Sequence, residues 1–132
     1  MKKVLITGAD GLVGNSIKSL AFLQNDKYIF NTQDKEGNNE QLEGVFIIRK
    51  EADLTNEQQV ERIYEVHKPE YVIHTAARVG GIGRNLNSPA KQFTENILMN
   101  THVIDKAHKH NVKKLIAFSS VCAFPSTAEV LK

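Results

Sequence analysis

The sequence predicts an α/β fold in which a doubly wound parallel sheet carries helices on both faces. Short apolar runs, rich in β-branched residues, alternate with longer segments whose apolar residues recur at helical spacing. The short runs are continuously apolar, as expected of parallel strands that are buried on both faces. The first of them leads directly into a glycine-rich turn that opens a helix. These three observations together favour alternating strands and helices in one sheet.

The first half of the chain is expected to hold three strands and one helix. Val4–Thr7 is the first strand, and Leu12–Gln24 is a helix because its apolar residues share one face. Tyr28–Phe30 is a possible second strand. The segment Asn31–Gly44 is almost entirely polar, so we expect an exposed loop there. Val45–Ile48 gives a much clearer strand signal.

The second half continues the alternation. Asp53-Leu54-Thr55 introduces a helix that is expected to run to about His67, with Thr55 or Asn56 as its N-cap. The remaining expected elements are the strand Tyr71–His74, a glycine-containing loop, the long helix Pro89–Asn111 and the strand Leu115–Phe118.

Length and composition describe one globular domain of 132 residues, 41% hydrophobic and 24% charged, with a net charge of +2. Lys2-Lys3 and Lys113-Lys114 stand beside strands without interleaved aromatic residues, which favours solvated strand ends over a nucleic-acid surface. Cys122 is the only cysteine, so we expect no internal disulfide and a cytoplasmic location. No apolar stretch approaches membrane-spanning length, and no membrane partner is expected.

The glycine turn is the strongest functional motif. Gly8 permits a tight turn out of the strand, Gly11 allows backbone to approach a pyrophosphate, and Gly14 allows the helix to pack closely on the sheet. The helix N-terminus then offers free N–H groups to an anion. The turn therefore predicts a Rossmann-type site for NAD or NADP, with contacts from Gly8, Gly11, Leu12, Val13 and Gly14.

Two residues compete to select between the two cofactors. An acidic side chain after the second strand binds the ribose 2′-hydroxyl of NAD, whereas an arginine there favours the 2′-phosphate of NADP. Asp34 has the expected spacing from Gly14 if the second strand is Tyr28–Gln33. Arg49 takes the position if that strand is Val45–Ile48. The sequence pattern alone leaves both open.

Two other strand ends carry candidate site residues. Ala76-Ala77-Arg78 follows the strand at Tyr71–His74 with small side chains against which a cofactor can lie. Ser120 and Cys122 follow the last strand, where a hydroxyl can bind a substrate oxygen and a thiol can move a proton. The spacing of the histidines does not suggest a metal-ligand set, and no metal is expected.

Several of these motifs together resemble the extended short-chain dehydrogenase/reductases that act on sugar nucleotides. The motifs are Thr7–Gly14, Asp53-Leu54-Thr55, His74-Thr75-Ala76-Ala77, Asn96 and Ser119-Ser120. Two further elements resemble the branch that epimerises and reduces GDP-4-keto-6-deoxy sugars, of which GDP-heptose enzymes are close variants. They are Arg78-Val79-Gly80-Gly81-Ile82 with Asn85, and Ser120–Pro125.

The resemblance implies a role for each matching residue. Ser120 would hold the 4-keto or 4-hydroxyl oxygen, and Cys122 would act as acid/base in epimerisation. Arg49 would align with a residue that contacts the 2′-phosphate, which tips the choice of cofactor toward NADP. The other implied cofactor contacts come from Asp53, Leu54, Ala76, Ala77, Arg78 and Asn96.

The chain also departs from that family. Val121 replaces a usual serine or threonine, Asp10 stands where some members carry an arginine, and no Tyr-x-x-x-Lys pair follows Ser120, since the one pair with this spacing, Tyr64 and Lys68, stands before Pro69. We therefore expect residues 1–132 to form a truncated NADP-binding domain that is inactive alone. The full-length enzyme would be a homodimer that acts on a GDP-sugar. The alternative is a non-catalytic dinucleotide-binding module.

Overall fold

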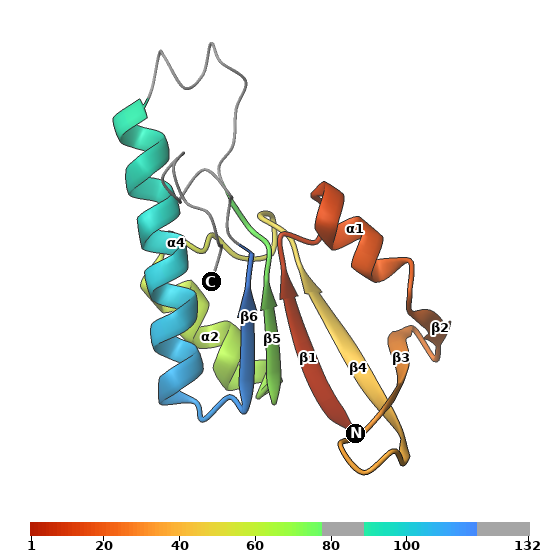
Figure 1. The fold of residues 1–132 in the computed structure, drawn as a ribbon. Coiled ribbons are helices and arrows are strands. Elements are labelled where there is room, and N and C mark those ends of the chain that lie inside the picture. Colours follow the sequence, from red (N-terminus) through yellow and green to blue (C-terminus); the bar gives the residue numbers. More distant parts are fainter. Residues whose placement is uncertain (78–88, 119–132) are drawn as a thin grey trace, which may run out of the picture.

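A six-stranded sheet forms the centre of the computed structural model, which describes residues 1–77 and 89–118. The strands lie in the order β2-β3-β4-β1-β5-β6 (Figure 1). The strand bounds are β1 Lys2–Thr7, β2 Phe22–Gln24, β3 Lys27–Gln33, β4 Asn39–Ile47, β5 Tyr71–His74 and β6 Lys114–Ala117. The helix bounds are α1 Leu12–Lys18, α2 Glu57–His67 and α4 Pro89–Lys109.

The four strands β4, β1, β5 and β6 are parallel, so their carboxyl ends meet at one edge of the sheet. Figure 1 shows α1 on one side of the sheet and α2 with α4 on the other. The chain passes from β1 through α1 and the β2–β3 hairpin to β4 on one side of β1, and then from β4 through α2 to β5 on its other side, as in a doubly wound fold. The predicted fold class, with helices on both faces, is confirmed.

The expected loop at Asn31–Gly44 is wrong, because most of this segment forms the antiparallel pair β3–β4. Its strands alternate between more and less exposed positions, so polar side chains suit the outer face. Gln41 donates to the side chain of Asn31 across the pair at 3.1 Å. The actual turn is confined to residues 34–38, where Asp34 accepts hydrogen bonds from the backbone N–H groups of Glu36 and Asn38.

The first helix is also shorter than predicted, since α1 ends at Lys18 and the chain then forms β2. Asn25 and Asp26 both adopt positive φ, 51° and 60°, in the two-residue connection to β3. Such left-handed pairs suit the twist of a hairpin, and asparagine and aspartate tolerate them. The apolar spacing through Leu23 had predicted a helix, but the chain forms a strand there. Leu20 and Leu23 are therefore exposed.

The main core lies between the sheet and the pair α2–α4. Leu5 and Val72 from the sheet are almost fully buried against Tyr64 and Val103 from the helices. The Tyr64 hydroxyl donates to the backbone carbonyl of Val103 at 2.8 Å, which satisfies its one polar group. At the start of α2, the Asn56 side chain accepts from the backbone N–H of Gln59, so Asn56 is the N-cap.

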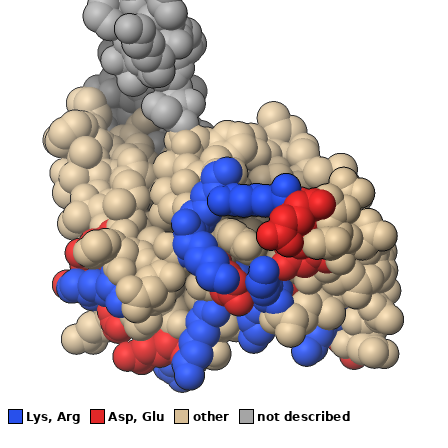
Figure 2. Space-filling view, turned by 60° about the horizontal axis from the view of Figure 1, so that its bottom comes forward, with Lys and Arg blue, Asp and Glu red and all other residues tan. Residues whose placement is uncertain are grey.

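The lysines at the beginnings of the parallel strands are accompanied by carboxylates. Lys2 pairs with Glu40 at 2.7 Å, and Lys113 pairs with Glu70 at 2.8 Å. Figure 2, which brings this end of the molecule forward, shows basic and acidic side chains next to one another. This mixture of charges favours the interpretation of Lys2-Lys3 and Lys113-Lys114 as solvated strand ends. In the described part of the chain, no helix is long and apolar enough to cross a membrane.

A buried cation joins the two helices of the core layer. The Lys106 ammonium lies 3.0 Å from a carboxylate oxygen of Glu57 and 2.9 Å from one of Glu61, and its side chain is only 7% exposed. Hydrogen bonding to Lys106 is the largest effect on both carboxyl groups, and it lowers the pKa of each below the ordinary value of 4.5.

These lowered pKa values predict acid sensitivity. A carboxylate with a lowered folded pKa stabilises the fold fully above its unfolded pKa and loses that contribution as the pH falls through the folded value. Urea unfolding at about pH 7 and about pH 3.5 should therefore show lower stability in acid. Lys106→Met should reduce that loss, whereas Lys113→Met, which removes an exposed partner of Glu70, should not. An identical pH dependence in all three proteins would contradict the prediction.

Candidate dinucleotide site

The glycine turn is packed too tightly to accept side chains at two of its three glycines. Gly8 has a φ of 67°, and a Cβ there would lie 2.7 Å from the backbone nitrogen of Ala76 and from the Thr75 hydroxyl. A Cβ on Gly14 would lie 2.1 Å from the carbonyl oxygen of Gly8. Gly8 thus allows the turn to touch the end of β5, and Gly14 allows α1 to pack on the turn.

Gly11 has a different environment from the other two glycines. It is the N-cap of α1, and a Cβ there would meet only the Gly8 carbonyl, at 3.3 Å. Its own carbonyl accepts from the backbone N–H of Asn15 at 2.9 Å, which starts the helix. The first N–H groups of a helix have no acceptors within the helix. The backbone N–H groups of Leu12 and Val13 can therefore donate hydrogen bonds to an anion.

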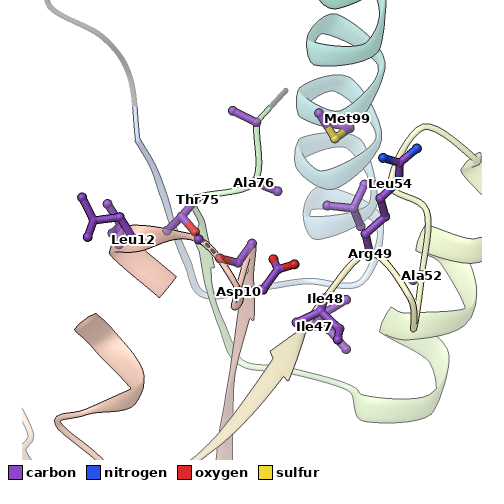
Figure 3. Close-up of a pocket in the computed structure, with 14 residues that line it drawn as sticks. Asp10, Leu12, Ile47, Ile48, Arg49, Ala52, Leu54, Thr75, Ala76 and Met99 are labelled. Carbon is purple, nitrogen blue, oxygen red and sulfur yellow. Dashed lines mark hydrogen bonds between the residues drawn. The ribbon is translucent and has the colours of Figure 1, made fainter. Parts of the chain in front are cut away.

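A pocket of about 550 Å³ opens above the carboxyl ends of β1, β4 and β5 (Figure 3). This volume lies in the range typical of small-molecule sites. Its lining comes from the glycine turn, the end of β4, the segment before α2, the end of β5 and the middle of α4. The lining residues are Gly8, Asp10, Gly11, Leu12, Val13, Ile47, Ile48, Arg49, Ala52, Leu54, Thr75, Ala76, Ala77 and Met99.

The lining of the pocket combines apolar side chains with two charged ones. Ile47, Leu54 and Met99 present buried apolar side chains, which suit a flat heterocycle such as adenine. Asp10 and Arg49 are the two ionisable residues of the described lining, and both are exposed. Met99 was not predicted as a site residue, although its four-residue spacing from Val103 on the buried face of α4 was a signal for it.

Thr7, His74 and Asn100 form a hydrogen-bonded chain beneath the pocket. The Thr7 hydroxyl oxygen accepts from the backbone N–H groups of Thr75 at 3.2 Å and Ala76 at 3.3 Å. Its own proton is then available for Nδ1 of His74, 2.7 Å away. Nε2 of His74 consequently carries the ring proton and donates to Oδ1 of Asn100 at 2.7 Å.

This chain of bonds requires a neutral imidazole. His74 is 2% exposed, and burial lowers its pKa, whereas the hydrogen bond to Asn100 acts in the opposite direction. The neutral ring therefore ties the end of β1 to the end of β5 and to α4. Its effect is to fix the backbone of Thr75 and Ala76, which line the pocket.

The structure separates the two candidates for cofactor selection. Arg49 follows β4, the strand that pairs with β1, and lines the pocket. Asp34 precedes the opposite end of that strand, and the span from Asn39 to Ile47 is roughly 26 Å. The alternative assignment to Asp34 is therefore wrong, because its strand β3 is antiparallel to β4 and ends at the other edge of the sheet.

The remaining predicted site residues are not all found in this pocket. Leu54, Ala76 and Ala77 line the pocket, together with the turn residues already described. Asp53 instead accepts hydrogen bonds from the backbone N–H and hydroxyl of Thr55, at 3.0 and 2.7 Å, and so shapes the segment before α2. Asn96 lines a smaller hollow on α4. Three more predicted residues, Arg78, Ser120 and Cys122, lie outside the described residues.

The parallel sheet, the glycine turn and the pocket at the carboxyl edge define a Rossmann-type α/β domain. The chain belongs to the NAD dependent epimerase/dehydratase family, whose model matches residues 4–132. The resemblance to extended short-chain dehydrogenase/reductases is thereby confirmed.

Individual relatives are similar over nearly the whole chain. A probable GDP-L-fucose synthase of Drosophila melanogaster is 35% identical over 125 residues, which are 95% of this chain and 35% of the relative. The structure of a GDP-L-fucose synthetase from Naegleria fowleri bound to NADP superposes with a TM-score of 0.75 at 29% identity, covering 98% of this chain and 37% of the other.

A GDP-D-glycero-L-gluco-heptose synthase from Campylobacter jejuni, solved in the presence of NADPH, gives a TM-score of 0.74 at 32% identity. It covers 99% of this chain and 34% of the other. The chain thus spans about a third of the length of the curated relatives that it matches.

Proposed function

We propose that residues 1–132 are the NADP-binding domain of a GDP-sugar epimerase/reductase. The observation that carries the proposal is the pocket at the carboxyl edge, with the tight glycine turn on one side and Arg49 on the other. The open backbone at Gly11 and the first N–H groups of α1 suit a pyrophosphate, and Arg49 suits a 2′-phosphate. NADPH would supply the hydride when bound, and the residues of this chain would hold and orient it.

The substrate part of the proposal comes from the relatives. A GDP-L-fucose synthase and a GDP-heptose synthase both match the chain at over 30% identity, so we propose a GDP-4-keto-6-deoxy sugar or a GDP-heptose as substrate. In this proposal Ser120 binds the sugar C4 oxygen and Cys122 moves protons during epimerisation. The assay is NADPH oxidation with such a sugar by the protein expressed from its complete reading frame. Binding of NADPH without oxidation would instead indicate a non-catalytic dinucleotide-binding module.

Arg49→Gln tests the cofactor part. We expect calorimetric titration to show NADPH affinity falling by about 10- to 100-fold, because a charge-assisted contact to phosphate is lost, while NADH affinity changes little. Lys50→Gln is the matched control, since Lys50 is the neighbouring exposed cation and is not among the described residues that line the pocket. Equal losses for both cofactors, or an equal effect of Lys50→Gln, would overturn the role of Arg49.

A further inference from the structure

The pocket contains a carboxylate that the proposed function does not use. Asp10 is exposed and stands in the glycine turn between Gly8 and Gly11. Figure 3 shows its carboxylate directed into the pocket, while the Arg49 guanidinium lies beside Leu54 and Met99. Within the described part of the chain, neither charged side chain forms an ion pair, so both are available to a ligand.

The backbone places Asp10 beside the strand end that carries Arg49. Thr7 is paired with Ile47, and the backbone N–H of Ala9 donates to the Ile47 carbonyl at 3.2 Å. Asp10 follows at once, and Arg49 is two residues beyond Ile47. In doubly wound folds the adenosine ribose lies over the end of the strand next to β1. The ribose hydroxyls of a bound dinucleotide would therefore lie near both charges.

We propose that Asp10 sets the cofactor preference of this pocket by opposing the 2′-phosphate that Arg49 attracts. The proposal rests on the proposed function, because it assumes that a dinucleotide occupies the pocket. A carboxylate accepts hydrogen bonds from ribose hydroxyls, which favours NADH, and repels a phosphate dianion, which disfavours NADPH. The opposed charges allow both cofactors to bind. The difference between the NADPH and NADH affinities is then much smaller than it would be with Arg49 alone.

Asp10→Asn is the test, with NADPH and NADH titrated separately against the purified protein. The substitution keeps the shape of the side chain and removes its charge. We expect the ratio of NADH to NADPH dissociation constants to rise about tenfold in favour of NADPH, the size expected for removing one charge close to a phosphate. Circular dichroism and the unfolding midpoint show whether the variant remains folded, as expected for an exposed side chain without a described partner.

Two control variants isolate the effect. Asp10→Glu keeps the charge and should leave the ratio within about twofold of the wild-type value. Asp26→Asn removes a charge from the β2–β3 connection, at a positive φ that asparagine tolerates, and should leave the ratio unchanged.

The failures of the two proposals are distinguishable. A wild-type protein that binds neither cofactor would overturn the proposed function and this inference with it. If the wild type binds but Asp10→Asn leaves the ratio unchanged, or raises both affinities equally, only the role of Asp10 is overturned. An equal rise would mean that Asp10 repels the pyrophosphate that both cofactors share.

Discussion

Replacing Gly14 with alanine is expected to lower the free energy of unfolding by about 2–4 kcal/mol. The new Cβ would lie 2.1 Å from the Gly8 carbonyl oxygen and 2.7 Å from the Cα of Ala9, and both contacts are to backbone. Backbone cannot rotate away as a flexible side chain can, so α1 must move off the turn. Chemical denaturation of the two proteins measures the difference.

Gly11→Ala is the matched comparison in the same turn. Its Cβ would meet one atom at 3.3 Å, and its φ of −82° is open to alanine. We expect it to cost less than about 1 kcal/mol, the usual scale for a change at an N-cap. Equal losses for the two alanine variants would mean that the close approach of α1 to the turn is not what makes Gly14 necessary.

Thr7→Val is expected to cost about 1–3 kcal/mol, because it leaves buried polar groups without partners. Valine has nearly the shape of threonine, so packing around the buried Thr7 side chain, which is 1% exposed, is preserved. The lost hydroxyl is the partner of Nδ1 of His74 and of two backbone N–H groups. Urea unfolding gives the loss in stability.

A second measurement on this variant concerns the pocket. We expect NADPH to bind several-fold more weakly to Thr7→Val, since the backbone N–H groups of Thr75 and Ala76 lose the acceptor that positions them. Thr7→Ser keeps the hydroxyl and should restore both stability and binding to near the wild-type values. A valine variant as stable as the wild type would show that the hydrogen-bonded chain through His74 contributes little.

The parts of the fold that follow local rules were predictable from the sequence. Strand β1 and the glycine turn lie in one short stretch of sequence. There the apolar run predicts the strand directly, and the glycines predict the tight turn. The hairpin β3–β4 was missed because its half-exposed strands use polar residues, as at Asn31 and Gln41, and polar runs also describe loops. Only the pairing between the strands distinguishes the two cases.

The site shows the same division between local and distant information. The glycines were predicted from one motif, but the choice between Asp34 and Arg49 depended on which strand lies beside β1. Strand order is a property of the whole sheet, and residue spacing from Gly14 favoured the wrong strand. Met99 was missed for a related reason. The sequence pattern predicts a buried methionine on a helix to be a core residue, and only the structure shows that Met99 also lines the pocket.

The bond between Thr7 and His74 joins residues 67 positions apart in the chain. The floor of the pocket therefore cannot assemble while only the first strand and the glycine turn are in place. It must wait for β5, whose pairing with β1 closes a long loop and is slow for that reason. During synthesis, a chain that has presented its whole glycine motif would still lack the ability to retain a dinucleotide. Retention of the ligand would then report that the central strands have come together.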